Sequence, residues 1–202
     1  FSLLISFTPA YDGKFTSNFF AFYAFISFGT VILTYIMSYE GNYMDGLMTR
    51  KESILNLLKA KYYTYSLGAL IPFVLMIPAV VMNKISLLKL CSFALFTVGF
   101  VYFFLFQLAV YNTKTIPLNV TTSSRQSSTG LQTLVSISVL FAPLLLHRGI
   151  ELFFEETTSL WILLGIGLSF ILTSSLWIKN IYRRFMMRRY KNMDEFRNTR
   201  EG

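Results

Sequence analysis

The chain of 202 residues is 54% hydrophobic and only 14% charged, with a mean hydropathy of +0.53. Soluble domains carry about a quarter charged residues, so this composition excludes an ordinary soluble enzyme or binding module and predicts an integral membrane protein. The net charge of +8 does not indicate a nucleic-acid partner, because the basic residues flank apolar runs, where anionic lipids and membrane topology account for them. The single cysteine, Cys91, excludes an intrachain disulfide.

The sequence opens on an apolar run, residues 1–7 (FSLLISF), without a basic segment before it, so the run does not resemble a signal peptide. We expect it to be the end of an earlier membrane span. Residues 8–14 (TPAYDGK) carry proline, aspartate and glycine, which is typical of a turn.

Five further segments are predicted to cross the membrane as helices, because each lacks charge and about 20 apolar residues suffice for a span. They are residues 15–39, 62–83, 90–113, 131–146 and 157–178. The predicted fold is therefore all-α and polytopic: a transmembrane domain over residues 1–178, with five complete spans and a partial N-terminal one, and a basic tail over residues 179–202. Pro72 and Pro78 lie inside the second predicted span, where they indicate either a static kink or a hinge.

An amphipathic helix is predicted between the first two complete spans, over residues 49–61. Thr49 and Glu52 have the spacing of a capping box, which marks a helix start. The expected apolar face consists of Ile54, Leu55, Leu57 and Leu58, and the polar face of Arg50, Lys51, Asn56, Lys59 and Lys61. Such a helix is either a juxtamembrane helix with snorkelling lysines or a docking surface.

The distribution of basic residues predicts the orientation. If spans alternate, residues 40–61, 112–130 and the tail lie on one side, and 14 of the 18 Lys and Arg residues fall there. Cytoplasmic loops are rich in Lys and Arg, so this side is expected to be cytoplasmic, together with the C-terminus. Asn119, in an Asn-Val-Thr sequon, is then predicted to carry no glycan.

The segment between these two spans resembles the pattern that follows the second span of ABC-2-type transporter permeases. The matching residues are Glu40, Gly41, Asp45, Gly46, Leu47, Met48, Thr49, Ser53, Ile54, Leu55, Ala60 and Lys61. Arg50 departs from the family's proline region, and the family's Gly-Thr pair is blurred into residues 42–46. These departures and the closing RRFMMRRYKNMDEFRN are more similar to an uncharacterised bacterial branch of these permeases.

The resemblance implies a six-span permease subunit of an exporter in the bacterial inner membrane, paired with a second permease copy. It also implies that the helix at residues 49–61 docks on a separate cytoplasmic P-loop ATPase. Thr49 and Glu52 would cap this helix; Ile54, Leu57 and Leu58 would form its docking face; Arg50, Lys51 and Lys61 would contact the ATPase or lipid. The chain contains no Gly-x-x-x-x-Gly-Lys-Ser/Thr motif, so we expect a partner to hydrolyse ATP and the chain itself to be no enzyme.

His147, Glu151 and Glu155 share the spacing of one helical face in a predicted outer segment. They could bind a divalent metal, but without a His-x-x-x-His motif we expect an interfacial helix with solvated acids, or a role at a substrate exit. We therefore predict no metal, cofactor or catalytic residue.

Two other function classes stay open. A non-transporting membrane scaffold fits the composition equally well, with anionic lipids at the basic tail in either case. An intramembrane enzyme is disfavoured, because the predicted spans contain almost no ionisable residue. The most polar side chain inside the third span is Gln107, and we expect it to form an interhelical hydrogen bond.

Overall fold

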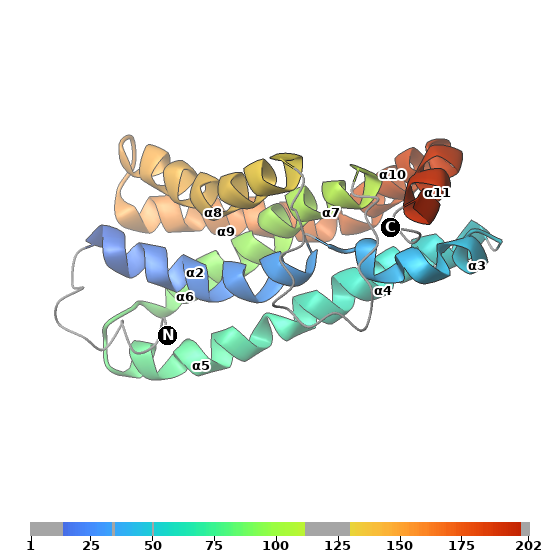
Figure 1. Ribbon diagram of the computed structural model, residues 1–202. Coiled ribbons are helices and arrows are strands. Elements are labelled where there is room, and N and C mark those ends of the chain that lie inside the picture. The colour runs from blue at the N-terminus through green and yellow to red at the C-terminus, as the bar shows by residue number, and fades with distance from the viewer. Residues whose placement is uncertain (1–13, 34, 50, 112–129, 199–202) are drawn as a thin grey trace.

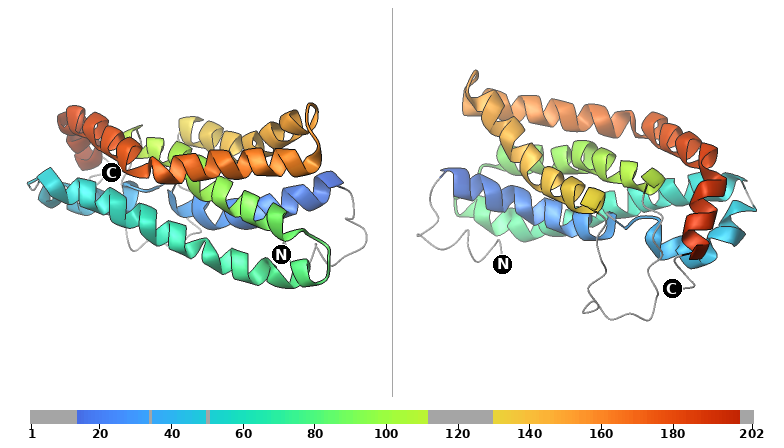
Figure 2. Two further views of the ribbon diagram at one scale, coloured as in Figure 1. Left: turned by 180° about the vertical axis from the view of Figure 1, so that it is seen from behind. Right: turned by 45° about the horizontal axis from the view of Figure 1, so that its top comes forward.

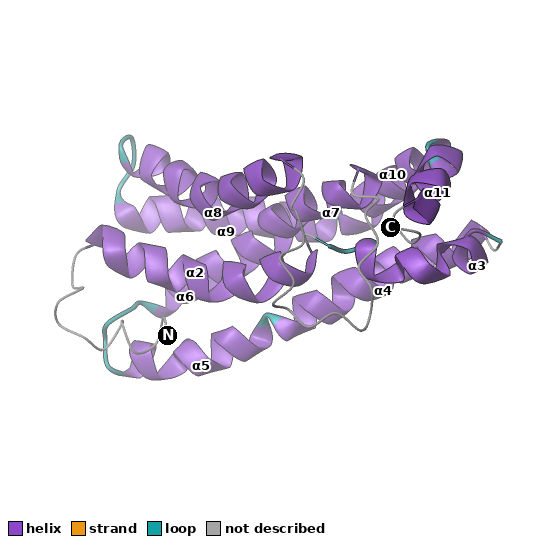
Figure 3. Ribbon diagram, in the orientation of Figure 1, coloured by secondary structure: helices purple, strands orange, loops and turns teal. Residues whose placement is uncertain are grey.

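The computed structural model describes residues 14–33, 35–49, 51–111 and 130–198, and this part of the chain consists of helices and turns without a strand (Figures 1 and 3). The predicted all-α fold is confirmed. The partial span at residues 1–7, Arg50 and the sequon at Asn119 lie outside the described residues.

The helices make five antiparallel passes along one bundle (Figures 1 and 2). Helix α2 (Lys14–Leu33) is the first pass, and a 3-10 helix η2 (Ser38–Tyr43) and the short α3 (Met44–Met48) lead into the second, α4 (Lys51–Gly68) and α5 (Leu70–Val81). The third pass consists of α6 (Leu87–Phe96), a π-helical turn η3 (Thr97–Val101) and α7 (Tyr102–Tyr111). Helix α8 (Gly130–Glu151) is the fourth, and α9 (Glu156–Leu172) with α10 (Ser174–Met187) is the fifth, followed by α11 (Arg189–Asn198).

Two helices in the described part are long and apolar enough to cross a membrane, namely Ile54–Val81 and Leu87–Tyr111. Helices α9 and α10 together form a third candidate that is bent by 57°. The structure thus shows two to three helices that could span a membrane, and the five predicted spans stay a prediction.

The second pass differs from its predicted boundaries, because no helix end separates residues 49–61 from residues 62–83. Helix α4 continues through Lys61 to Gly68, since the sequence has neither glycine nor proline between Lys51 and Gly68. Backbone hydrogen bonds from Ala69 to Tyr65 (3.1 Å) and from Phe73 to Ala69 (3.3 Å) then join α4 to α5. The amphipathic helix and the following span are one rod, which we call the α4–α5 rod.

The predicted basic tail also begins differently. Helix α10 starts at Ser174 and crosses the expected boundary at Lys179, and it buries Ile181 and Phe185 in the bundle. Arg184 donates a hydrogen bond from α10 to the side-chain oxygen of Gln107 in α7. The predicted interhelical hydrogen bond of Gln107 is therefore present, and its partner comes from the segment that the sequence suggested was a tail.

Helix α9 crosses the third pass at two glycines. A Cβ atom on Gly167 of α9 would lie 2.6 Å from backbone atoms of Leu95 and Phe96, and one on Gly99 of η3 would collide with the Gly167 carbonyl. Small residues allow helix backbones to approach this closely, and close approach is a main source of helix association inside membranes.

We predict that Gly167→Ala destabilises the bundle, because its methyl group meets backbone atoms that cannot move aside. Overpacking of this kind costs about 1–3 kcal/mol, which lowers the melting temperature of a chain of this size by about 2–12 °C. Thermal unfolding of the detergent-solubilised protein measures the change. Gly165→Ala is the matched control, because a Cβ at Gly165 meets nothing within 4 Å. Equal melting temperatures for the two variants would show that the crossing is not tight.

Candidate functional site

The segments richest in basic residues lie at one end of the bundle (Figure 1). The η2–α3 segment, the start of α4 and the helices α10 and α11 gather there, and the α5–α6 and α8–α9 turns lie at the other end (Figures 1 and 2). We call the first group the basic end. Successive passes run in opposite directions, as the predicted orientation requires. That the basic end faces the cytoplasm stays a prediction.

The expected docking face of residues 49–61 is turned into the protein. Ile54 and Leu58 are completely buried, and they belong to the same hydrophobic core as Ile181 and Phe185 of α10; Leu57 is half-buried against that core. Ile54 and Leu58 are therefore not exposed to a partner, as the predicted docking face would require.

The start of α4 is only partly described. The Thr49 hydroxyl is exposed and donates to the carbonyl oxygen of Gly46 in α3 at 2.7 Å. The side chains of Lys51 and Glu52 lie outside the described part, as does Arg50, so the capping box stays a prediction.

Lys61 makes contacts inside the protein. Its ammonium nitrogen lies 3.0 Å from a carboxylate oxygen of Glu40 and also donates to the carbonyl oxygen of Ile36. Both side chains are less than one third exposed, at 14% for Lys61 and 28% for Glu40. Lys61 therefore fixes the α4–α5 rod to η2 and to the residues just before it.

A second ion pair fixes the short helix α3. Arg197 of α11 lies 3.1 Å from a carboxylate oxygen of Asp45, and the two side chains are about half exposed. Three residues near these two ion pairs are exposed, namely Tyr43 (60%), Gly46 and Thr49. These three residues are three apart on consecutive helical turns, so they share one face, which we call the elbow surface.

At the other end, the structure brings His147 and Glu151 together but not Glu155. His147 Nε2 lies 3.3 Å from a carboxylate oxygen of Glu151 and 3.3 Å from the Asn18 side-chain nitrogen of α2. His147 is buried, with a relative exposure of 2%, and burial lowers its pKa. Glu155 precedes α9 and is exposed. His147 therefore belongs to a buried polar contact between α2 and α8, whereas Glu155 is exposed to solvent.

This contact shows no catalytic or metal-binding arrangement. Glu151 also accepts from Arg148 at 3.0 Å, so its charge is shared. No group of three His, Cys, Asp or Glu that could hold a metal is found within the described residues. The sequence analysis did not identify Asn18 as part of this contact. The only signal for it was a single amide side chain in the first turns of an apolar helix.

Comparison with known protein families matches residues 1–199 to the model described as "Family of unknown function (DUF5687)". No curated protein and no solved structure matches the chain. The match covers nearly the whole sequence, including both ends of the bundle.

We predict that Lys61→Met destabilises the protein by about 1–2 kcal/mol, because it leaves the partly buried Glu40 carboxylate without its charged partner. The double variant Lys61→Met/Glu40→Gln should regain part of this loss, since both charges are removed. Chemical denaturation in detergent measures the free energy of unfolding for each variant. Lys191→Met is the control: its pair with Glu195 spans 3.8 Å on exposed side chains, and such pairs contribute little. Equal effects of Lys61→Met and Lys191→Met would contradict the proposed tie.

Proposed function

The chain belongs to the DUF5687 family, and we propose that it is the membrane-embedded permease subunit of an ATP-driven exporter of the ABC-2 type. In this proposal the basic end lies in the cytoplasm of a bacterial cell, and a separate ATPase docks on the elbow surface. A second permease copy would complete the transport path.

The α4–α5 rod is the observation that carries this proposal. Its apolar part, Ile54–Val81, is 28 residues long. At 1.5 Å per residue it extends about 42 Å, more than the hydrocarbon thickness of a bilayer. The Lys61–Glu40 pair joins the rod to the segment that leads into the elbow surface. A force applied to the elbow would therefore tilt one continuous helix, and rigid-body tilting of helices is a common way to switch a transporter.

This proposal places ATPase docking on the elbow surface, whereas the sequence prediction placed it on the helix at residues 49–61. The residues of the ABC-2-like pattern from Asp45 to Met48 lie in α3, and Thr49 follows directly. Helix α3 precedes the rod between the first two described passes, where the resemblance places a coupling helix. Ile54 and Leu58 are buried, whereas Tyr43, Gly46 and Thr49 of the elbow surface are exposed and open to a partner.

A static scaffold is the second candidate, and one observation favours it. The elbow is tied to α11 through Arg197 and Asp45, and the apolar stripe of α4 is buried in the same core as residues of α10. Such ties would suit a rigid platform as well as a lever. The two functions differ in whether an ATPase binds the elbow surface.

We predict that a P-loop ATPase co-purifies with the full-length protein from its native cells in mild detergent, and that Gly46→Arg reduces its recovery about tenfold or more. The arginine would project from the elbow surface into the interface, while a Cβ at Gly46 meets nothing within 4 Å, so the fold should tolerate it. Mass spectrometry of the purified complex gives the recovery.

The matched control is Gly149→Arg, because Gly149 is equally open but lies on α8 near the opposite end. Its ATPase recovery should equal that of the unsubstituted protein. If no P-loop ATPase appears, or if Gly46→Arg retains it, the permease proposal fails and the scaffold becomes the better account.

A further inference from the structure

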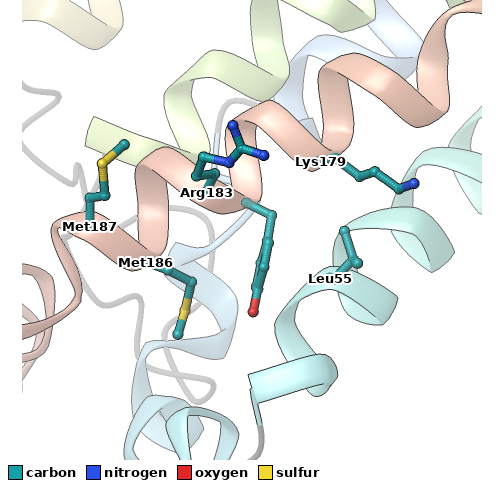
Figure 4. A pocket seen from close by; sticks show the side chains of 6 residues that line it. Leu55, Lys179, Arg183, Met186 and Met187 are labelled. Atoms are coloured by element: carbon teal, nitrogen blue, oxygen red, sulfur yellow. The ribbon is translucent and has the colours of Figure 1, made fainter.

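A groove lies between α4 and α10 at the basic end (Figure 4). It has a volume of about 490 Å³ and is lined by Leu55 of α4 and by Lys179, Tyr182, Arg183, Met186 and Met187 of α10. Figure 4 shows Lys179 reaching from α10 toward α4, with Leu55 on the facing helix. The groove therefore combines two cationic side chains with an apolar wall.

The two cations of the groove have no carboxylate within ion-pair distance among the residues that the structure describes. Other basic residues at this end do have one: Lys61 pairs with Glu40 at 3.0 Å, and Arg197 pairs with Asp45 at 3.1 Å. Lys179 and Arg183 are exposed and one helical turn apart, so both can contact one anion. These two exposed cations are therefore available to an anion from outside the chain.

The groove lies where the predicted spans end. Leu55 lies at the start of the apolar helix Ile54–Val81, and Lys179 directly follows the predicted end of the fifth span at Ile178. Leu176, three residues before Lys179 and seven before Arg183, shares their helical face and is 68% exposed. An apolar surface thus continues from the cations toward the middle of the bundle.

We infer that this groove binds the headgroup of an anionic phospholipid of the cytoplasmic leaflet. The phosphate and its negative charge contact Lys179 and Arg183, and the acyl chains follow the apolar face that includes Leu176. An anionic phospholipid fits both the cationic and the apolar part of this surface. A membrane attracts basic side chains at the depth of the headgroups and apolar side chains beneath them. The inference depends on membrane embedding and not on an ATPase partner.

The test is a lipid titration of the purified protein by native mass spectrometry. Phosphatidylglycerol and phosphatidylcholine with identical acyl chains are the probes, and the substituted protein is Lys179→Gln/Arg183→Gln. We expect a clear preference for phosphatidylglycerol, and about tenfold weaker phosphatidylglycerol binding by the variant, since each basic residue contributes to attraction of anionic lipid. Charge-preserving Lys179→Arg/Arg183→Lys should retain most of the binding.

The matched control is Arg189→Gln/Lys191→Gln, which removes two charges of the same basic end outside the groove. It should leave phosphatidylglycerol binding nearly unchanged. An equal loss in both variants would overturn the inference, because it would show a general surface charge effect. Equal binding of both lipids, or displacement of phosphatidylglycerol by millimolar inorganic phosphate, would overturn it as well, the latter by indicating a site for a free anion.

Discussion

The close backbone contact between α9 and the third pass determines the arrangement of the bundle. With glycines at positions 99 and 167, the two helices approach closely enough for Phe100 and Phe103 to pack on Phe170, at ring-centroid distances of 5.3 and 5.0 Å. The Trp177 indole then donates to the Phe170 carbonyl oxygen at 2.9 Å, across the 57° bend between α9 and α10. Because α9 is fixed, the direction of α10 is fixed too.

Helix α10 contributes to two features of the basic end, namely the core around the apolar stripe of α4 and the groove beside Leu55. Its apolar residues Ile181 and Phe185 join the core that buries the stripe of α4, and its Arg184 reaches Gln107 of α7. Its other face carries Lys179 and Arg183, which line the groove beside Leu55. The same helix therefore shares a core with the stripe that the sequence prediction assigned to an ATPase, and it lines a groove suited to a lipid headgroup.

Composition and spacing predicted the helical class and the hydrogen-bonding role of Gln107, because uncharged runs and isolated polar residues are local signals. The end of α4 was not predictable in this way: Tyr62 and Tyr63 suggest an interface, but neither residue breaks a helix. Ile54 and Leu58 are buried in the same core as residues of α10, and most of α10 lies in the segment that was predicted to be a basic tail. The contact between Asn18 and His147 joins residues 129 apart in sequence, and no local pattern indicates such a pairing.

The proposed function and the lipid site both require that the basic end faces the cytoplasm. The most direct test is cysteine labelling in a Cys91→Ser background, with single Gly46→Cys and Glu155→Cys substitutions at opposite ends of the bundle. A membrane-impermeant maleimide should label Gly46→Cys only in inverted membrane vesicles and Glu155→Cys only in spheroplasts. The opposite pattern, or labelling of both positions from one side, would contradict the orientation and with it the cytoplasmic docking of an ATPase.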